Sequence, residues 1–276
     1  MITLFKTFMG LMKKPKKPRA RFFSLIPGAH TLYPVIRSEE LDRDWIKSEK
    51  EDYRERQTKC PMANIMNAIP FNQPHSIGKC PAINSVMRTG YVVRAPADFK
   101  VHTNGDGHTI LFTTTPFSPP GSDYVVLHDS DTAKWLMDSS KDNVIDQVIK
   151  VNTCWRVQAD DDIVFLQTKV PFVNESRFSA ISGILDPRSA YEVNVQLWWH
   201  VKEGDEVVKA GTPLACYVPI SRKLLENLDV SIDVATPEDF VLENEFQFTA
   251  YNEFQENVNV TKRQLKTNKI LRKYWK

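Results

Sequence analysis

The chain has 276 residues, of which 42% are hydrophobic and 25% are charged, and this composition is typical of a globular protein and excludes a disordered or fibrous one. The net charge is only +2, and no apolar run reaches the roughly 20 residues that a membrane-spanning helix needs. The length predicts one large domain or two small ones, with a core that needs no disulfide or metal.

The charge is concentrated at the two ends of the sequence. Residues 1–21 and residues 262–276 each contain seven basic residues and no acid. The residues between these two ends therefore contain 22 basic residues and all 34 acids. Such ends can bind nucleic acid, an anionic surface or an acidic protein, and solvated tails are the alternative. The candidate binding residues at the first end are Lys13, Lys14, Lys16, Lys17, Arg19 and Arg21.

The first part of the sequence predicts little regular structure. Residues 1–37 are expected to form a basic arm, because Pro15, Pro18 and Pro27 interrupt any regular element. A helix is predicted over residues 38–57, with Ser38 as N-cap and acids in its first turn. After an irregular stretch, a short helix is predicted from Pro81 to a stop at Gly90.

From residue 91 onward the apolar residues recur with a period of two. A hairpin turn at Asn104-Gly105 or Asp106-Gly107 joins the first two predicted strands. The alternation is clearest over residues 191–201, where one face carries only apolar side chains: Tyr191, Val193, Val195, Leu197, Trp199 and Val201. This pattern is typical of a strand buried on one side and wet on the other. We therefore expect a mainly β fold, a β sandwich or barrel with short helices, whose body covers residues 58–235.

The body is expected to close with a strand over residues 213–220. Pro213 and Pro219 fit only where no ladder N–H is needed, which favours a place near the rim. Trp198 is predicted to point outward as a contact surface, and coverage by the same chain is the alternative. Residues 236–276 are predicted to form a helical C-terminal extension with a basic end.

Several short motifs resemble a family of uncharacterised proteins of tailed phages and bacteria. The resemblance covers about residues 78–224 and rests on Cys80-Pro81, Pro96-Ala97-Asp98, Gly183 with Asp186, Gly211-Thr212-Pro213, and Pro219 with Arg222. It implies a β-rich domain and no particular activity. Residues 180–220 also resemble dUTPases and dCTP deaminases, which are trimeric β barrels, through GILDPRSAYEVNV and GTPLACYVPI.

The second resemblance implies a nucleotide-acting enzyme with two site residues. Asp186 would orient water or the sugar, and Tyr191 would stack on a base. The alternative for Asp186 is an Asp-Pro turn in which its carboxylate accepts local backbone N–H groups.

Two other kinds of catalytic site are considered from the residues themselves. His128, Asp131 and His200 supply the two imidazoles and one carboxylate of an oxygenase-type metal site, although the usual His-x-Asp spacing is absent. Cys80 lies at a predicted helix N-terminus, where a thiolate is stabilised. The alternatives are a turn before a helix cap for His128 and Asp131, and a structural role for Cys80.

The function predicted from these features is non-catalytic. We expect a phage-encoded protein that assembles with copies of itself or docks on other phage proteins, in the host cytoplasm or the virion, without a cofactor and without a membrane span. A nucleotide-acting or metal-dependent enzyme with a pocket in the β body is one alternative. Nucleic-acid binding through the basic ends is the other.

Overall fold

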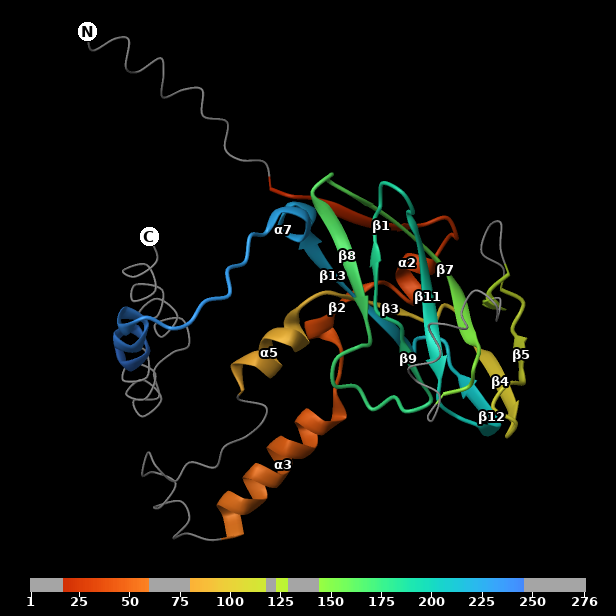
Figure 1. Ribbon diagram of the computed structural model, residues 1–276. Coiled ribbons are helices and arrows are strands. Elements are labelled where there is room, and N and C mark those ends of the chain that lie inside the picture. The colour runs from red at the N-terminus through yellow and green to blue at the C-terminus, as the bar shows by residue number, and fades with distance from the viewer. Residues whose placement is uncertain (1–16, 60–79, 118–122, 129–143, 246–276) are drawn as a thin grey trace, which may run out of the picture. The chain divides into compact units, whose positions relative to one another are not determined.

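A computed structural model describes residues 17–59, 80–117, 123–128 and 144–245 (Figure 1). The chain divides into two compact units, one of residues 1–43 with 84–228 and the other of residues 44–83 with 229–276. The first unit contains all the described strands, which form three antiparallel sheets. The predicted mainly β fold is thereby confirmed, and the described strands form open sheets rather than a closed barrel.

The first sheet is built around a long central strand, β7 (Val148–Ala159). On one side β7 pairs with β11 (Glu192–Trp199), and β11 pairs in turn with β9 (Phe178–Ala180). On its other side β7 pairs at one end with β1 (Ala20–Ser24) and at the other end with β6 (Val125–Leu127).

The second and third sheets complete the first unit. The second has the order β10-β8-β13-β3-β2, with these strands at Gly183–Leu185, Ile163–Thr168, Pro213–Ser221, Tyr91–Arg94 and Ile36–Arg37. The third has the order β12-β4-β5, at Glu203–Val208, Phe99–Asn104 and Ile110–Thr114. β4 and β5 form the predicted hairpin, and Gly105 and Gly107 both have positive φ in its turn.

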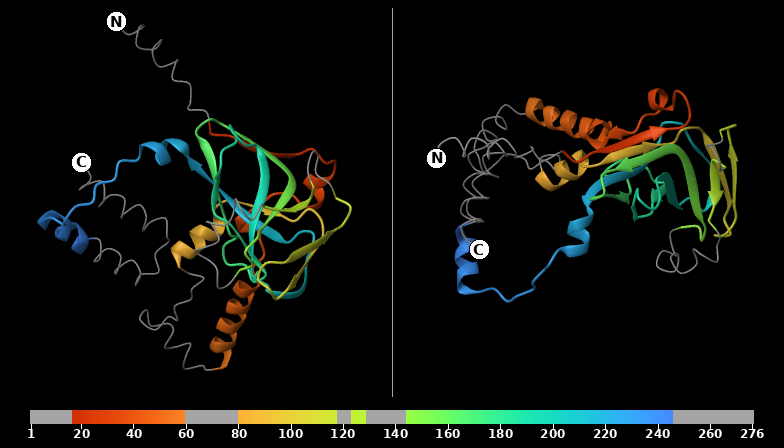
Figure 2. Two further views of the ribbon diagram at one scale, coloured as in Figure 1. Left: turned by 45° about the vertical axis from the view of Figure 1, so that its right-hand side comes forward. Right: turned by 90° about the horizontal axis from the view of Figure 1, so that it is seen from above.

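The first two sheets pack face to face, as in a sandwich, and Figure 2 shows them from two further sides. The Phe22 ring of β1 lies edge-on to Phe165 of β8, with 5.5 Å between the ring centroids. A polar contact also crosses the interface. The buried Tyr217 hydroxyl of β13 donates to Gln167 Oε1 of β8 at 2.6 Å and lies 3.2 Å from the Asn194 carbonyl of β11. Because every buried polar atom needs a partner, this contact fixes how the two sheets align.

The predicted alternation along residues 191–201 is confirmed within β11. Val193, Val195, Leu197 and Trp199 are completely buried in the main core, and the residues between them are half-buried. β7 differs, because it is buried on both faces from Val148 to Val157 apart from a half-buried Lys150. Its pairing with β11 also shifts register between Glu192 and Asn194. Such a bulge increases the local twist of the strand.

The segment expected to be an irregular basic arm contributes regular structure. Residues 20–24 are β1, residues 29–32 form the short helix α2 (Ala29–Leu32), and residues 36–37 are β2. Pro18 and Pro27 lie outside these elements, so neither removes a donor that the sheet needs. The prolines thus delimit an edge strand rather than exclude one.

The described helices match the prediction in part. The helix predicted over residues 38–57 is a 3-10 turn at Ser38–Glu40 followed by α3 (Asp44–Lys59). Ser38 does not cap α3, since its hydroxyl accepts from the buried Arg43 guanidinium at 3.0 Å. The helix predicted at Pro81 is α5 (Pro81–Arg88).

Two further helices follow the last strand. α7 (Arg222–Asn227) has Ser221 as its N-cap. A helix over residues 237–245 opens the predicted C-terminal extension, with Thr236 and Asp239 bonded to each other at its start. The rest of the extension, with its basic end, lies outside the described residues. None of the helices within the described ranges is long and apolar enough to span a membrane.

Candidate interaction site

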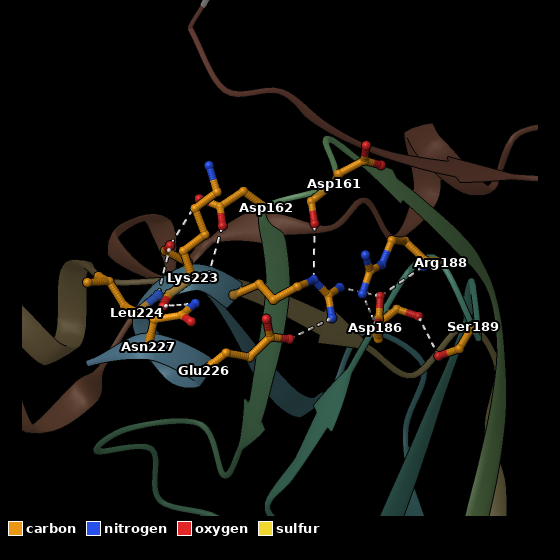
Figure 3. Close-up of polar contacts among 11 residues, drawn as sticks. Asp161, Asp162, Asp186, Arg188, Ser189, Lys223, Leu224, Glu226 and Asn227 are labelled. Carbon is orange, nitrogen blue, oxygen red and sulfur yellow. Dashed lines mark hydrogen bonds and ion pairs between the residues drawn. The ribbon is translucent and has the colours of Figure 1, made fainter. Parts of the chain in front are cut away.

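Asp186 and Arg222, both taken from the resemblance motifs, meet as an ion pair (Figure 3). Asp186 follows β10, and Arg222 begins α7 after β13. One guanidinium nitrogen of Arg222 donates to the Asp186 carboxylate at 2.6 Å, and Arg222 Nε donates to the main-chain carbonyl of Asp161 at 3.1 Å. The side chains are only 14% and 23% exposed. The pair therefore ties three separate segments of the second sheet together.

The neighbouring Asp162 holds the start of α7. Its carboxylate accepts from the Ser221 hydroxyl at 2.9 Å and from the Lys223 main-chain N–H at 3.0 Å, and its carbonyl accepts the Arg222 N–H at 2.8 Å. A carboxylate at a helix N-terminus satisfies backbone donors that would otherwise lack partners. These contacts, chiefly that of the Lys223 N–H, lower the pKa of Asp162.

Asp186 is also held by its own turn. Its carboxylate accepts the Arg188 N–H at 3.0 Å (Figure 3). Its carbonyl accepts the N–H groups of Ser189 and Ala190 at 3.0 and 2.9 Å. The hydrogen bond from Arg222 is the largest cause that lowers the pKa of Asp186 to about 2, and desolvation acts in the opposite direction. Asp186 is thus a permanently charged partner of Arg222 at neutral pH.

The pKa of Asp186 gives a testable pH dependence. In the unfolded chain an aspartate titrates near pH 3.9. The pair therefore stabilises the fold fully above about pH 4, and this contribution is lost as the pH falls towards about 2. We expect Asp186→Asn to lower the midpoint of thermal unfolding at pH 7 by about 2–6 °C. We expect a smaller difference between variant and wild type at pH 3.

Asp161→Asn is the matched control for this prediction. Asp161 reaches Arg222 through its main-chain carbonyl, which the substitution leaves in place. Thermal unfolding followed by circular dichroism at both pH values compares the two variants. Equal midpoints for Asp186→Asn and wild type at pH 7 would contradict a stabilising role of the pair.

Two other resemblance motifs also meet in space. The Asp98 carboxylate accepts the Ala210 N–H at 2.7 Å and the Lys209 ammonium at 2.8 Å. The lysine contact is the first cause that lowers the pKa of Asp98. In the backbone, Gly211 N–H donates to the Ala95 carbonyl and Ala95 N–H donates to the Thr212 carbonyl, each at 2.8 Å. The Pro96-Ala97-Asp98 and Gly211-Thr212-Pro213 motifs thus form one joint between the strands that they flank.

The residues proposed for nucleotide chemistry are placed as follows. The Asp186 carboxylate is engaged in the ion pair with Arg222. Tyr191 is 51% exposed just before β11, and the Arg156 guanidinium carbon lies 5.9 Å from its ring centroid. The nearly buried Arg156 side chain also pairs with Glu192 at 3.0 Å. The exposed ring of Tyr191 thus covers a charge within the fold.

The residues proposed for a metal site are held in separate places. His128 follows β6, and burial, followed by the nearby Lys150, lowers the pKa of its imidazole. His200 follows β11, and its Nε2 lies 2.9 Å from the Ser179 hydroxyl. Asp131 lies outside the described residues. Within the described ranges, no three His, Cys, Asp or Glu side chains gather as a metal site would require.

The remaining single-residue candidates are Cys80 and Trp198. Cys80 directly precedes α5 and is half-buried. Trp198 was expected to point outward, but it is half-buried and packs with Val144, Val148 and Ile181. The same chain therefore covers much of its ring, which was the alternative in the sequence.

Ser179 and His200 form a pair that the sequence did not single out. A serine hydroxyl bonded to an imidazole is the first element of a nucleophile with its base. Ser179 also lines a cavity of about 460 Å³ together with Val86, Phe172 and Glu175. The two residues are 21 positions apart and are joined only by the pairing of β9 with β11, so no local pattern indicates the contact.

A groove of about 700 Å³ runs along β1 and carries the described part of the basic N-terminal cluster. Arg19 and Arg21 line it and are exposed, and so is the adjacent Lys17. Phe22 and Tyr91 supply its apolar lining. The Arg19 N–H is fixed by the Asp160 carboxylate at 2.8 Å, so the strand is held while its basic side chains are not buried. Lys13, Lys14 and Lys16 lie outside the described residues.

The segment that follows α7 is acidic, in contrast to the basic groove along β1. Residues 229–245 contain six acids and no basic residue. Their apolar side chains are exposed, reaching 95% at Ile232 and 91% at Val234. Exposed apolar side chains in such a concentration are typical of an interaction surface. The sequence matches no protein-family model, and a search of curated proteins finds no relative of it.

Proposed function

We propose that this protein is a non-catalytic component that assembles with copies of itself or docks on other proteins. The observation that carries this proposal is the row of large apolar side chains exposed after β13: Leu224, Leu225, Leu228, Val230, Ile232, Val234, Phe240 and Val241. A chain that stayed alone would keep this apolar surface in water, at a cost of roughly 25 cal/mol for each Å². Burial against a partner removes that cost.

The polar residues of the β body support the same proposal. Asp98, Asp162 and Asp186 each bind a backbone N–H group together with a side chain of a distant segment. A general base or a water-orienting carboxylate needs an unoccupied oxygen facing a substrate. These carboxylates instead face partners within the fold, as expected of structural residues.

The resemblance to proteins of tailed phages supports the proposal that this function belongs to a phage. A phage-encoded assembly component would act in the host cytoplasm or within the virion. The acidic segment after α7 and the basic groove along β1 would steer such a partner by opposite charge, which sets association rate and register.

Sedimentation velocity of the purified full chain over a range of concentrations tests the proposal. We expect a mass of at least two chains at micromolar concentrations. Thermal unfolding with nucleoside triphosphates and with divalent metal ions is measured in parallel, and we expect no stabilisation. A monomer at every concentration would contradict self-assembly, and a midpoint raised by several degrees by one of these ligands would contradict the non-catalytic role.

A further inference from the structure

We propose that residues 228–234 of one copy add as a strand to the outer edge of β1 in a second copy. The inference rests on the proposed function and names the surface through which the copies meet. It requires an acceptor strand with an unpaired edge, a donor segment that can be extended, and side chains that match across the pair.

β1 has the properties of an acceptor. Among the described strands it pairs with β7 alone, so it is an edge of the first sheet. The groove of about 700 Å³ lies beside it, lined also by Tyr91, Ile163 and Pro219 of the second sheet. An edge strand exposes backbone N–H and C=O groups that template a further strand.

The side chains of β1 alternate in character. Successive residues of a strand point to opposite faces. Phe22 packs inward against Phe165 and Tyr91. Arg21 therefore lies on the opposite face, where its guanidinium covers the Phe23 ring at 5.2 Å. Within β1, Arg21 and Phe23 thus share one face and Ala20 and Phe22 the other. The three residues before β1 continue this alternation in the sequence, with Lys17 and Arg19 in step with Arg21 and Pro18 in step with Ala20.

Residues 228–234 have the properties of a donor. The sequence LDVSIDV alternates without a break, with four apolar residues and, between them, Asp229, Ser231 and Asp233. The structure assigns this stretch to neither helix nor sheet, and its apolar side chains are between 66% and 95% exposed. A period of two is the pattern of a strand with one buried face.

The two segments match in an antiparallel register. With Asp229 opposite Arg21, Asp233 falls opposite Lys17, because both pairs of charges are four residues apart. The same register places Leu228 opposite Phe22, Val230 opposite Ala20 and Ile232 opposite Pro18. Opposite charges then meet on the face that carries Arg21 and apolar side chains meet on the face that carries Phe22, and both kinds of cross-strand pair are favourable.

A second copy is the occupant because every chain carries both halves of the contact. Two chains that exchange these segments satisfy both edges at once, and the twofold symmetry closes the assembly. Seven extended residues span about 23 Å. In this register residues 228–233 lie opposite Ala20 to Phe22 of β1 and the three residues that precede it.

Two adjacent substitutions test the register. Val230→Asp places a charge opposite Ala20, on the face that carries Phe22, whereas Ser231→Asp places the same charge opposite Arg19, on the face that carries Arg21. We expect Val230→Asp to raise the dissociation constant of the assembly by roughly tenfold or more. Ser231→Asp is expected to leave it unchanged or to lower it. Both positions are outside regular structure, so circular dichroism should show an intact fold in both variants.

Charge reversal tests whether the contact forms between copies. Lys17→Glu with Arg21→Glu, and Asp229→Lys with Asp233→Lys, should each weaken self-association by roughly tenfold. Mixing these two double variants should restore association, because both exchanged pairs are again complementary when one chain of each variant meets. Sedimentation velocity of each variant and of the mixture gives the result.

The outcomes separate this inference from the proposed function. Association in the mixture and weakening by Val230→Asp alone support the strand exchange. An assembly that tolerates all of these substitutions overturns the exchange but leaves the proposed self-assembly intact. Association of a chain that carries all four reversals, without association in the mixture, shows the segment on its own β1 and overturns the second copy. A wild-type monomer overturns both the strand exchange and the proposed self-assembly.

Discussion

Gly90→Ala should destabilise the protein by about 2–5 kcal/mol, through strain together with overpacking. Gly90 has φ of +91°, which L residues other than glycine rarely adopt. A Cβ atom there would lie 2.7 Å from Cys216 Sγ and 2.9 Å from the Tyr217 carbonyl oxygen. Neither the core cysteine nor the backbone of β13 can move without disturbing the second sheet. Urea unfolding followed by circular dichroism measures the loss.

Gly107→Ala is the matched control for Gly90→Ala. Gly107 has a similar φ of +81°, but no atom outside its neighbours lies within 4 Å of the added Cβ. Both substitutions impose the left-handed strain of about 1–2 kcal/mol, and only Gly90→Ala adds the clash. Equal losses in the two variants would show that the approach of Gly90 to β13 is not as close as described.

Leu197→Ala should cost about 2–5 kcal/mol of unfolding free energy. Leu197 is completely buried in β11, opposite Ile149 of β7 and Ala180 of β9. Truncation leaves a cavity between two paired strands, which cannot both close on it. The loss of unfolding free energy in Leu197→Ala therefore measures how much one of the alternating buried residues of β11 contributes to the core.

The same substitution at Leu111 provides the control. Leu111 lies on the edge strand β5 and is 61% exposed. Leu111→Ala should change the free energy of unfolding by about 0.5 kcal/mol or less. Comparable losses at Leu111 and Leu197 in urea unfolding would mean that the alternating residues of β11 do not form the core.

The strand pattern and one hairpin could be predicted because they depend on local sequence. Alternating apolar residues fix which side of β11 is buried, and glycines supply the positive φ of the turn at Gly105 and Gly107. β1 was missed because prolines near it favoured an irregular arm, although they stand just outside the strand. The burial of β7 on both faces depends on what covers it, which periodicity does not report.

The polar contacts that hold separate strands together could not be predicted, since the residues that form them are distant in sequence. Asp186 and Arg222 are 36 residues apart, and Asp98 and Ala210 are 112 apart. Each residue was singled out by a short motif, but only the pairing of strands shows which motif meets which. Strand pairing places Asp186, a catalytic candidate in the sequence, against Arg222. It also places Ser179 next to His200, a contact that no local sequence pattern predicts.

The structure thereby separates two kinds of polar residue. Those of the resemblance motifs hold strands and α7 together, and their substitution should change stability. Those of the acidic segment and the basic groove make few contacts within the fold, and their substitution should change association. Arg177 lies outside these motifs but is also structural, because its bidentate bonds to Glu175 raise the pKa of its guanidinium and both side chains are mostly buried.

Hydrogen–deuterium exchange of the full chain at low and high protein concentration tests the central claim most directly. An unpaired segment exchanges its amide hydrogens at once, whereas a strand added to β1 exchanges them slowly. The account predicts that the amides of residues 229–234 and of β1 become protected together as the concentration rises. Rapid exchange of residues 229–234 at every concentration, in a sample whose mass exceeds one chain, would contradict it.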